Sequence, residues 1–152
     1  MPEKTTLKRA AQDRREGKAP STQAGEFVRE EMEHIRRGKH GARSPQQAIA
    51  IGLSKARRAG VDLKPPKKGR ASEKTRKSAE RDYRKGHSAK KKSSSWRSGA
   101  RLKALKREPG SAASRSALSK QAKSAAQRRK RLGPATEGAG RRTGRSSHRK
   151  AA

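Results

Sequence analysis

Large apolar residues gather in one short stretch of this chain. Over the whole sequence Leu, Ile, Val and Phe make up 13 of 152 residues, well below the roughly 20% at which a highly charged chain is expected to stay disordered. Ordering a residue costs about 1–2 kcal/mol of backbone entropy, so the apolar area suffices for one small core only. We therefore predict a small helical module at residues 21–63. Its large apolar residues are Phe27, Val28, Met32, Ile35, Ile49, Ile51, Leu53, Val61 and Leu63.

Most of the positive charge lies outside this apolar stretch, in the C-terminal part of the chain. The chain contains 44 Lys and Arg against 13 Asp and Glu, a formal net charge of +31. Residues 1–64 carry 15 basic and 8 acidic side chains, and residues 65–152 carry 29 and 5. This asymmetry predicts a polar leader at residues 1–20 and a basic, largely disordered, nucleic-acid-binding tail at residues 64–152.

The first predicted helix covers about residues 24–37. Val28, Met32 and Ile35 are spaced i, i+4, i+7, which places them on one helical face. Ser21 and Thr22 are the candidate N-caps. Gly38 is expected to end the helix, since glycine adopts the left-handed conformation at helix C-termini readily.

The second predicted helix, about residues 45–59, has the clearest boundaries. Ser44 is a favoured N-cap, Pro45 occupies the first helical position, and Gln47 completes the pattern of a capping box. Gly60 follows the last turn and predicts a Schellman ending.

These two helices are expected to form an antiparallel or angled hairpin. The link between them is short, and Gly52 permits close packing against the first helix. Marginal helices are predicted at about residues 72–85, 100–107 and 112–132. The fold class is thus mostly α with extensive disorder.

The segment GKHGARSPQQAIAIGLSKARRAG, residues 38–60, resembles an uncharacterised family of small, highly basic bacterial proteins, known only as a domain of unknown function. The likeness extends to GKAPSTQAGEFV before it and to RSALSKQAKSAAQRR after it. The resemblance implies a bacterial setting but brings no activity and no binding residues. In composition alone, the tail is also similar to histone-H1-like proteins.

The sequence favours a protein that is not an enzyme. Without cysteine it has no disulfides, thiolate metal sites or cysteine nucleophile. No phosphate-binding loop or GxSxG motif occurs. His34 and His40 are expected to be solvated, as is the acidic cluster of Glu26, Glu30, Glu31 and Glu33, which alternatively pairs with the basic tail. We expect no catalytic, cofactor or metal site.

Nucleic acid is the expected partner, with DNA favoured over RNA. A cation density this high binds polyanions through counterion release. Trp96 either stacks on a base or wedges between base pairs, or is simply an exposed or lightly packed residue of the tail. The predicted binding residues are Lys55, Arg57, Arg58, Lys67, Lys68, Arg70, Lys90, Lys91, Lys92, Trp96, Arg101, Lys103, Lys106, Arg107, Arg128, Arg129, Lys130, Arg131, Arg141 and Arg142.

Three functions follow as hypotheses. The first is sequence-independent, histone-like DNA binding in the nucleoid of the cytoplasm, and the second is association with RNA or the ribosome. The third is a protein-interaction or self-association module with a basic localising tail. The face expected to dock a protein comprises Val28, Met32, Ile35, Ile49 and Leu53.

The sequence favours no membrane association. No apolar run long enough for a membrane span is present, and the N-terminus lacks the apolar region of a secretory signal.

Overall fold

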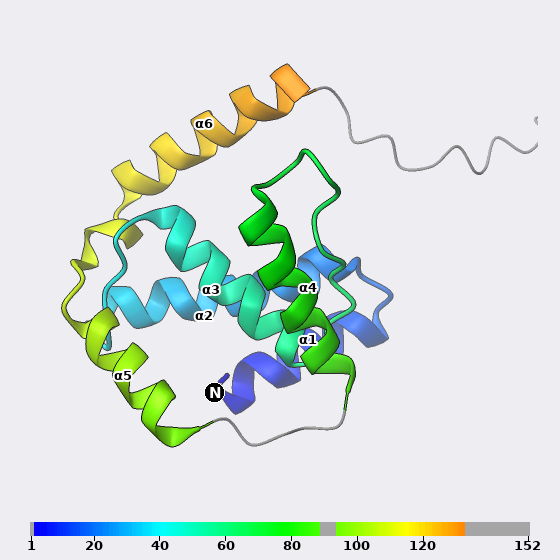
Figure 1. The fold of residues 1–152 in the computed structure, drawn as a ribbon, viewed down its shortest axis with the longest axis horizontal. Helices are drawn as coiled ribbons and strands as arrows, with labels where there is room; N and C mark the ends of the chain where they lie inside the picture. Colours follow the sequence, from blue (N-terminus) through cyan, green and yellow to red (C-terminus); the bar gives the residue numbers. More distant parts are fainter. Residues whose placement is uncertain (1, 89–93, 133–152) are drawn as a thin grey trace, which may run out of the picture.

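The computed structural model describes residues 2–88 and 94–132, and 73% of these residues are helical, with no strand among them. The predicted helical class is therefore confirmed for this part of the chain. Along the sequence, the elements shown in Figure 1 are α1 (Lys4–Arg15), α2 (Pro20–Arg36), α3 (Pro45–Arg58), α4 (Glu73–His87), α5 (Ser95–Lys106), the 3-10 turn η1 (Gly110–Ala113) and α6 (Arg115–Leu132).

Helices α2 and α3 form the centre of the fold. At their crossing the backbones approach so closely that a Cβ added to Gly52 would lie 2.7 Å from the Cα of Val28. No real side chain tolerates that distance, so this crossing requires glycine. The other described elements pack around this pair.

The boundaries of α3 are those that its sequence predicts. The backbone N–H of Gln47 donates to Ser44 Oγ at 3.2 Å, which caps the first turn. At the other end Gly60 has φ +93°, and the N–H of Val61 donates to the carbonyl of Ala56 at 3.2 Å, as in a Schellman motif.

Helix α2 begins earlier than its sequence suggests. Ala19 is its N-cap residue and makes no side-chain cap hydrogen bond, while Pro20 occupies the first helical position. The prediction of Ser21 and Thr22 as caps was wrong, because both lie inside the helix. Proline has a fixed φ suited to the first turn, and it lacks one of the N–H groups that the start of a helix leaves unpaired, so it favours a helix start at residue 20.

Two apolar clusters lie toward opposite ends of the α2–α3 pair, and alanine dominates both. Small side chains let the helices approach closely, so few large apolar residues are needed. One cluster joins α1, α2 and α3, and consists of Ala10, Ala24, Phe27, Ala56 and Val61, with Leu53 and Leu63 packed against it. The other joins α2, α3, η1 and α6, and consists of Met32, Ile35, Ala42, Ala48, Ala112 and Ala113, with Val28, Ile49 and Leu118 at its edge.

The packed unit is larger than the module predicted at residues 21–63. Helix α1, within the predicted leader, buries Thr6 and Ala10 and packs against α2. Helix α4, within the predicted tail, buries Ala79 and Asp82 and packs against α3. Alanine and polar contacts hold both helices, and neither gives a strong apolar periodicity in the sequence.

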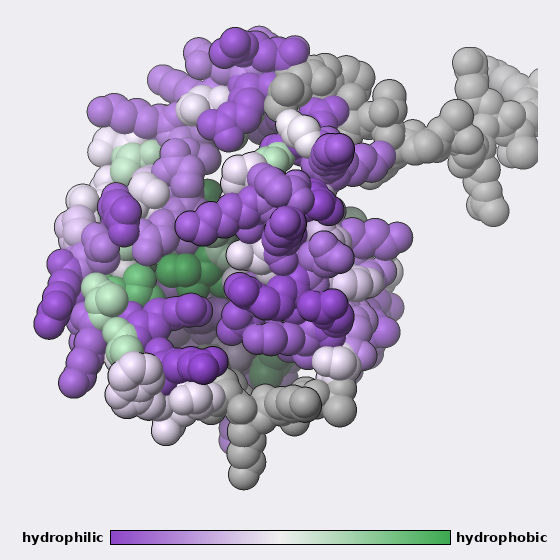
Figure 2. Space-filling model, viewed as in Figure 1, coloured by the Kyte–Doolittle hydropathy of each residue, from purple (hydrophilic) through white to green (hydrophobic). Residues whose placement is uncertain are grey.

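The apolar face expected to dock a protein is covered by the chain itself. Met32 and Ile35 are 8% and 2% exposed, and η1 and α6 pack over them. Val28 and Ile49 are partly buried at the edge of the same cluster. Figure 2 shows hydrophilic side chains over most of one face of the molecule, with hydrophobic residues gathered in a hollow of it.

Candidate nucleic-acid interface

The cations at the end of α3 turn inward. Lys55 Nζ lies 2.6 Å from Glu31 Oε2 and 3.4 Å from Glu30 Oε1, and only 22% of its side chain is exposed. Arg57 is 8% exposed, its Nε donates to the carbonyl of Leu63 at 3.0 Å, and burial lowers the pKa of its guanidinium. Both cations hold the fold together, so this structure does not support a phosphate contact by either.

Arg58 is also engaged within the fold. Its Nε donates to Asp82 Oδ1 at 2.8 Å, and its Nη2 lies 2.7 Å from the same oxygen. The other carboxylate oxygen of Asp82 accepts a hydrogen bond from Ser54 Oγ at 2.6 Å. Asp82 thereby ties α4 to α3, and Arg58 is committed to that contact.

Helix α5 presents cations without a compensating acid. Its sequence, SWRSGARLKALK, has four basic residues and no acidic one, and it buries no residue. Trp96 is 79% exposed in the first turn and Leu102 is 45% exposed. The helix is held at its C-terminal end, where the carbonyl of Leu105 accepts from the N–H of Gly41 at 2.9 Å. The exposed cations here, including the residue after the helix, are Arg97, Arg101, Lys103, Lys106 and Arg107.

Helix α6 repeats this composition at greater length. It has seven basic residues and no acidic one in 18 residues. No cation of α5 or α6 forms an ion pair with a carboxylate of the described residues. Three exposed cations of α6, Arg115, Lys120 and Lys123, were not predicted as binding residues because each is isolated among Ser, Ala, Leu and Gln in the sequence. The exposed cations are Arg115, Lys120, Lys123, Arg128, Arg129, Lys130 and Arg131.

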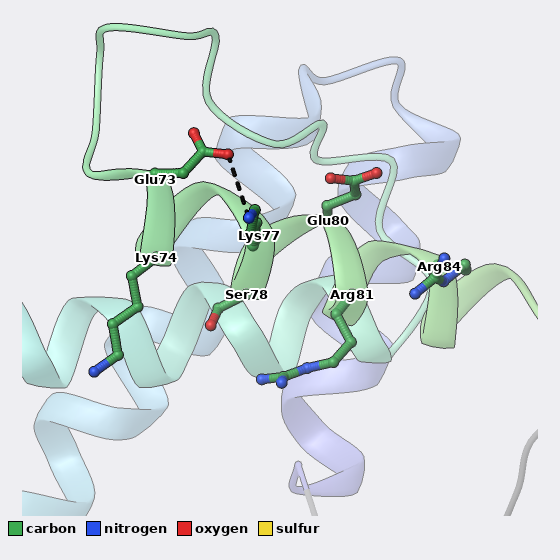
Figure 3. A pocket seen from close by; sticks show the side chains of 7 residues that line it. All are labelled: Glu73, Lys74, Lys77, Ser78, Glu80, Arg81 and Arg84. Carbon is green, nitrogen blue, oxygen red and sulfur yellow. Dashed lines mark ion pairs between the residues drawn. The ribbon is translucent and has the colours of Figure 1, made fainter.

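A hollow on α4 adds four cations that are not among the binding residues predicted from the sequence. It is lined by seven residues of that helix: Glu73, Lys74, Lys77, Ser78, Glu80, Arg81 and Arg84. Figure 3 shows Lys74, Ser78 and Arg81 pointing to one side, and Glu73 and Glu80 to the other. The i, i+4, i+7 spacing of that first trio is the signal that reveals the shared face. Such an open, charged surface suits a polyanion better than a small molecule.

The remaining predicted cations lie in loops or outside the described residues. Lys67 and Lys68 are exposed and Arg70 is half-buried in the loop between α3 and α4. The N–H of Arg70 donates to the carbonyl of Lys67 at 3.1 Å, which closes a turn. Lys90, Lys91, Lys92, Arg141 and Arg142 lie outside the described residues.

Part of the acidic cluster of α2 is buried and not solvated. Glu30 and Glu31 are 5% and 1% exposed, which corrects the expectation for these two. His34 Nε2 pairs with Glu3 Oε1 at 2.8 Å, and His40 Nε2 lies 3.1 Å from Glu31 Oε1, so neither histidine is freely solvated. Hydrogen bonds from Lys39 and His34 lower the pKa of Glu3 to about 2. These acids lie close to basic side chains of the packed fold, and within the described residues none of them pairs with α5 or α6.

None of the protein-family models, curated proteins or solved structures compared with this chain matches it significantly. The family resemblance of residues 38–60 therefore stays an expectation. In the two described stretches, no helix has both the length and the apolar character needed to cross a membrane.

Proposed function

We propose that the protein binds DNA through its phosphate backbone, without sequence preference and without catalysis. The observation that carries this proposal is the separation of charges. Helices α5 and α6 contain no acidic residue, and their cations are exposed and unpaired with the described carboxylates. In the packed part of the fold, by contrast, buried carboxylates hold cations such as Lys55.

The dimensions of α6 suit a polyanion. A helix of 18 residues is about 27 Å long, and duplex DNA carries one negative charge per about 1.7 Å. Cations spread along such a helix face several phosphates at once. Each phosphate that they neutralise releases counterions, which drives binding irrespective of base sequence.

Trp96 gives the interface a second kind of contact. It lies at the exposed start of α5, 79% accessible, with Arg97 next to it and Arg101 slightly more than one turn away. An exposed indole flanked by cations stacks on bases in single strands or wedges between base steps in duplexes. This exposure is the observation that favours the alternative partner, RNA.

DNA remains our first choice because base readers of RNA use several aromatic side chains, and this chain has one Phe, one Tyr and one Trp. Phe27 is fully buried, so it is not available for stacking. The setting that follows is the bacterial nucleoid. A protein-interaction function has less support, because η1 and α6 cover the apolar face of α2 and α3.

Salt dependence tests the mechanism. The affinity of the full chain for random duplex DNA is measured by fluorescence anisotropy at about 50 and about 200 mM salt. A protein with 6–10 phosphate contacts loses about 10³–10⁵ in affinity over that range. An affinity that barely changes would show that phosphate contacts do not drive binding.

Crosslinking in cells distinguishes the two nucleic acids. Sequencing of the crosslinked material is expected to give DNA fragments spread over the genome. Recovery of ribosomal RNA with little DNA would replace the proposal with the alternative.

A further inference from the structure

Three side chains that bind metals well converge where α2 turns toward α3. One ligand atom from each of Glu31, His34 and His40 lies within 4.8 Å of the others. Glu31 and His34 are one turn apart on α2. Gly38, with φ +69°, then reverses the chain so that His40 returns alongside them. The three side chains are only 1%, 12% and 8% exposed, so the cluster is almost closed to solvent.

The hydrogen bonds of His40 leave one ring nitrogen facing a carboxylate. Its Nδ1 lies 3.0 Å from the carbonyl oxygen of Gly41, and a carbonyl only accepts, so Nδ1 carries the hydrogen. In the neutral ring Nε2 is then an acceptor, yet it lies 3.1 Å from Glu31 Oε1, a second acceptor. Two acceptors at this distance repel each other. Either a second proton on the His40 ring or a cation bound to both atoms is therefore needed to make the contact favourable. A backbone carbonyl that holds the opposite nitrogen is the usual support of a metal-binding histidine.

The carboxylate of Glu31 gives a second sign that this cluster can bind a cation. Both of its oxygens are buried, and neither accepts a hydrogen bond of good geometry from the described residues. Lys55 Nζ is only 2.6 Å from Oε2 and balances part of the charge, whereas Oε1 lies 3.1 Å from His40 Nε2. A buried carboxylate oxygen without a donor is costly, and a metal ion would satisfy it.

We propose that Glu31, His34 and His40 bind a divalent transition-metal ion of the Zn²⁺ class. Imidazole nitrogens and a carboxylate oxygen are established zinc donors, at about 2.0–2.2 Å from the metal. Ligand atoms of a tetrahedral site at that radius are about 3.3 Å apart, close to the 3.1 Å between His40 Nε2 and Glu31 Oε1. Two further carboxylate oxygens lie near His34 Nε2 and can complete the set: Glu3 Oε1 at 2.8 Å and Glu30 Oε1 at 3.9 Å.

The site is structural because its ligands are buried. A bound ion joins α2 to the loop that leads into α3, and Lys55 extends the network to α3 itself. The ion therefore stabilises the α2–α3 junction, and none of its proposed ligands belongs to α5 or α6. The inference does not depend on the proposed DNA binding.

Zinc titration of the metal-free full chain tests the site. Calorimetry is expected to show one Zn²⁺ per chain, and a matched titration with Mg²⁺ is expected to show no binding, since Mg²⁺ prefers oxygen ligands. In NMR spectra, Zn²⁺ is expected to shift the imidazole signals of His34 and His40 and to leave those of His87 unchanged. This second measurement uses the native sequence, so it holds even if a variant fails to fold.

Variants then identify the ligands. His40→Gln and Glu31→Gln are each expected to weaken zinc binding at least about 100-fold, because each removes a direct ligand. His87→Gln is the matched control, because His87 is exposed and stacks on Tyr83 away from the cluster. Equal zinc affinity in all three variants, or zinc-dependent shifts at His87 in place of His34 and His40, would overturn the site. So would the absence of zinc binding by the native chain, and the cluster would then be an ion-pair network only.

Discussion

Asp82 shows how a single carboxylate holds an outer helix in a chain with little apolar area. Its side chain is 7% exposed and accepts hydrogen bonds from Ser54 and Arg58 on α3. Within the described residues, neither apolar cluster includes a residue of α4, so we expect the polar contact to contribute much of its attachment.

Replacement of Asp82 by alanine is therefore expected to destabilise the protein by about 1–3 kcal/mol, since it leaves buried polar partners without their acceptor. The free energy of unfolding is measured by urea denaturation followed by circular dichroism. Glu80→Ala on the same helix is the control. Glu80 is 58% exposed, lies 4.0 Å from Arg76, and is expected to change stability by less than about 0.5 kcal/mol. Equal effects of the two variants would mean that Asp82 does not anchor α4.

The single tyrosine of the chain reports on a second tertiary contact. Tyr83 on α4 donates its hydroxyl hydrogen to Asp62 Oδ1 in the loop after α3, and this hydrogen bond to a carboxylate raises the pKa of the phenol above its usual 10.0. Because the folded pKa is raised, the contribution to stability is complete below the unfolded pKa, and it is lost as pH rises through the folded value.

Asp62→Asn is expected to lower the pKa of Tyr83 toward 10, since the acceptor loses its negative charge. Ultraviolet absorbance of the tyrosinate gives the pKa without interference from other tyrosines. Asp13→Asn, on the distant α1, is expected to leave it unchanged. A Tyr83 pKa that does not respond to Asp62→Asn would show that the hydrogen bond does not form in solution.

At the scale of elements, the crossing of α2 and α3 gives the two helical glycines Gly25 and Gly52 different surroundings. Gly52 lies against the backbone of Val28, whereas a Cβ at Gly25 in α2 would meet nothing within 4 Å. Alanine is the better helix former at both positions, by about 1 kcal/mol.

Gly25→Ala is therefore expected to stabilise the protein by up to about 1 kcal/mol, and Gly52→Ala to destabilise it by about 1–3 kcal/mol because the helices must move apart. Thermal unfolding of both variants gives the comparison. Stabilisation by Gly52→Ala would show that the two helices do not cross this closely.

The sequence could predict the elements whose boundaries depend on local signals, and it could not predict those that depend on tertiary packing. The boundaries of α3 depend on local hydrogen bonds of Ser44 and on the left-handed Gly60, and such local signals are visible in the sequence. The packing of α1 was not predicted, because Thr6 and Ala10 give no apolar stripe. The start of α5 at Ser95, earlier than the predicted residue 100, was missed for a similar reason: Trp96 stays exposed and adds no periodic apolar contact.

The candidate interface was predictable as a region and not in its individual residues. The excess of cations after residue 64 is visible in composition alone. That Lys55 and Arg57 point inward depends on carboxylates and carbonyls that only the tertiary fold brings near them. The converging histidines were missed for the same reason, since His34 and His40 meet only after the chain reverses at Gly38.

At the scale of the whole molecule, two uses of positive charge can be separated by experiment. Some cations form ion pairs with carboxylates within the fold, and those of α6 do not pair with any described carboxylate. If net charge alone determined DNA affinity, the loss of any four cations would have the same effect. If the exposed cations of α6 bind phosphates, the loss of four cations from α6 reduces DNA affinity more than the loss of four cations elsewhere.

We expect glutamine at Arg128, Arg129, Lys130 and Arg131 to reduce the salt dependence of DNA affinity by about one unit of log–log slope for each phosphate that the variant no longer neutralises. The matched control places glutamine at Lys18, Arg29, Arg37 and Arg76, each of which pairs with a carboxylate. Both sets remove the same formal charge, and the control is expected to change the slope less, because its cations are already partly neutralised. Anisotropy titrations over a series of salt concentrations measure both slopes. Identical slopes would assign binding to the net charge of the whole chain and not to a surface that includes α6.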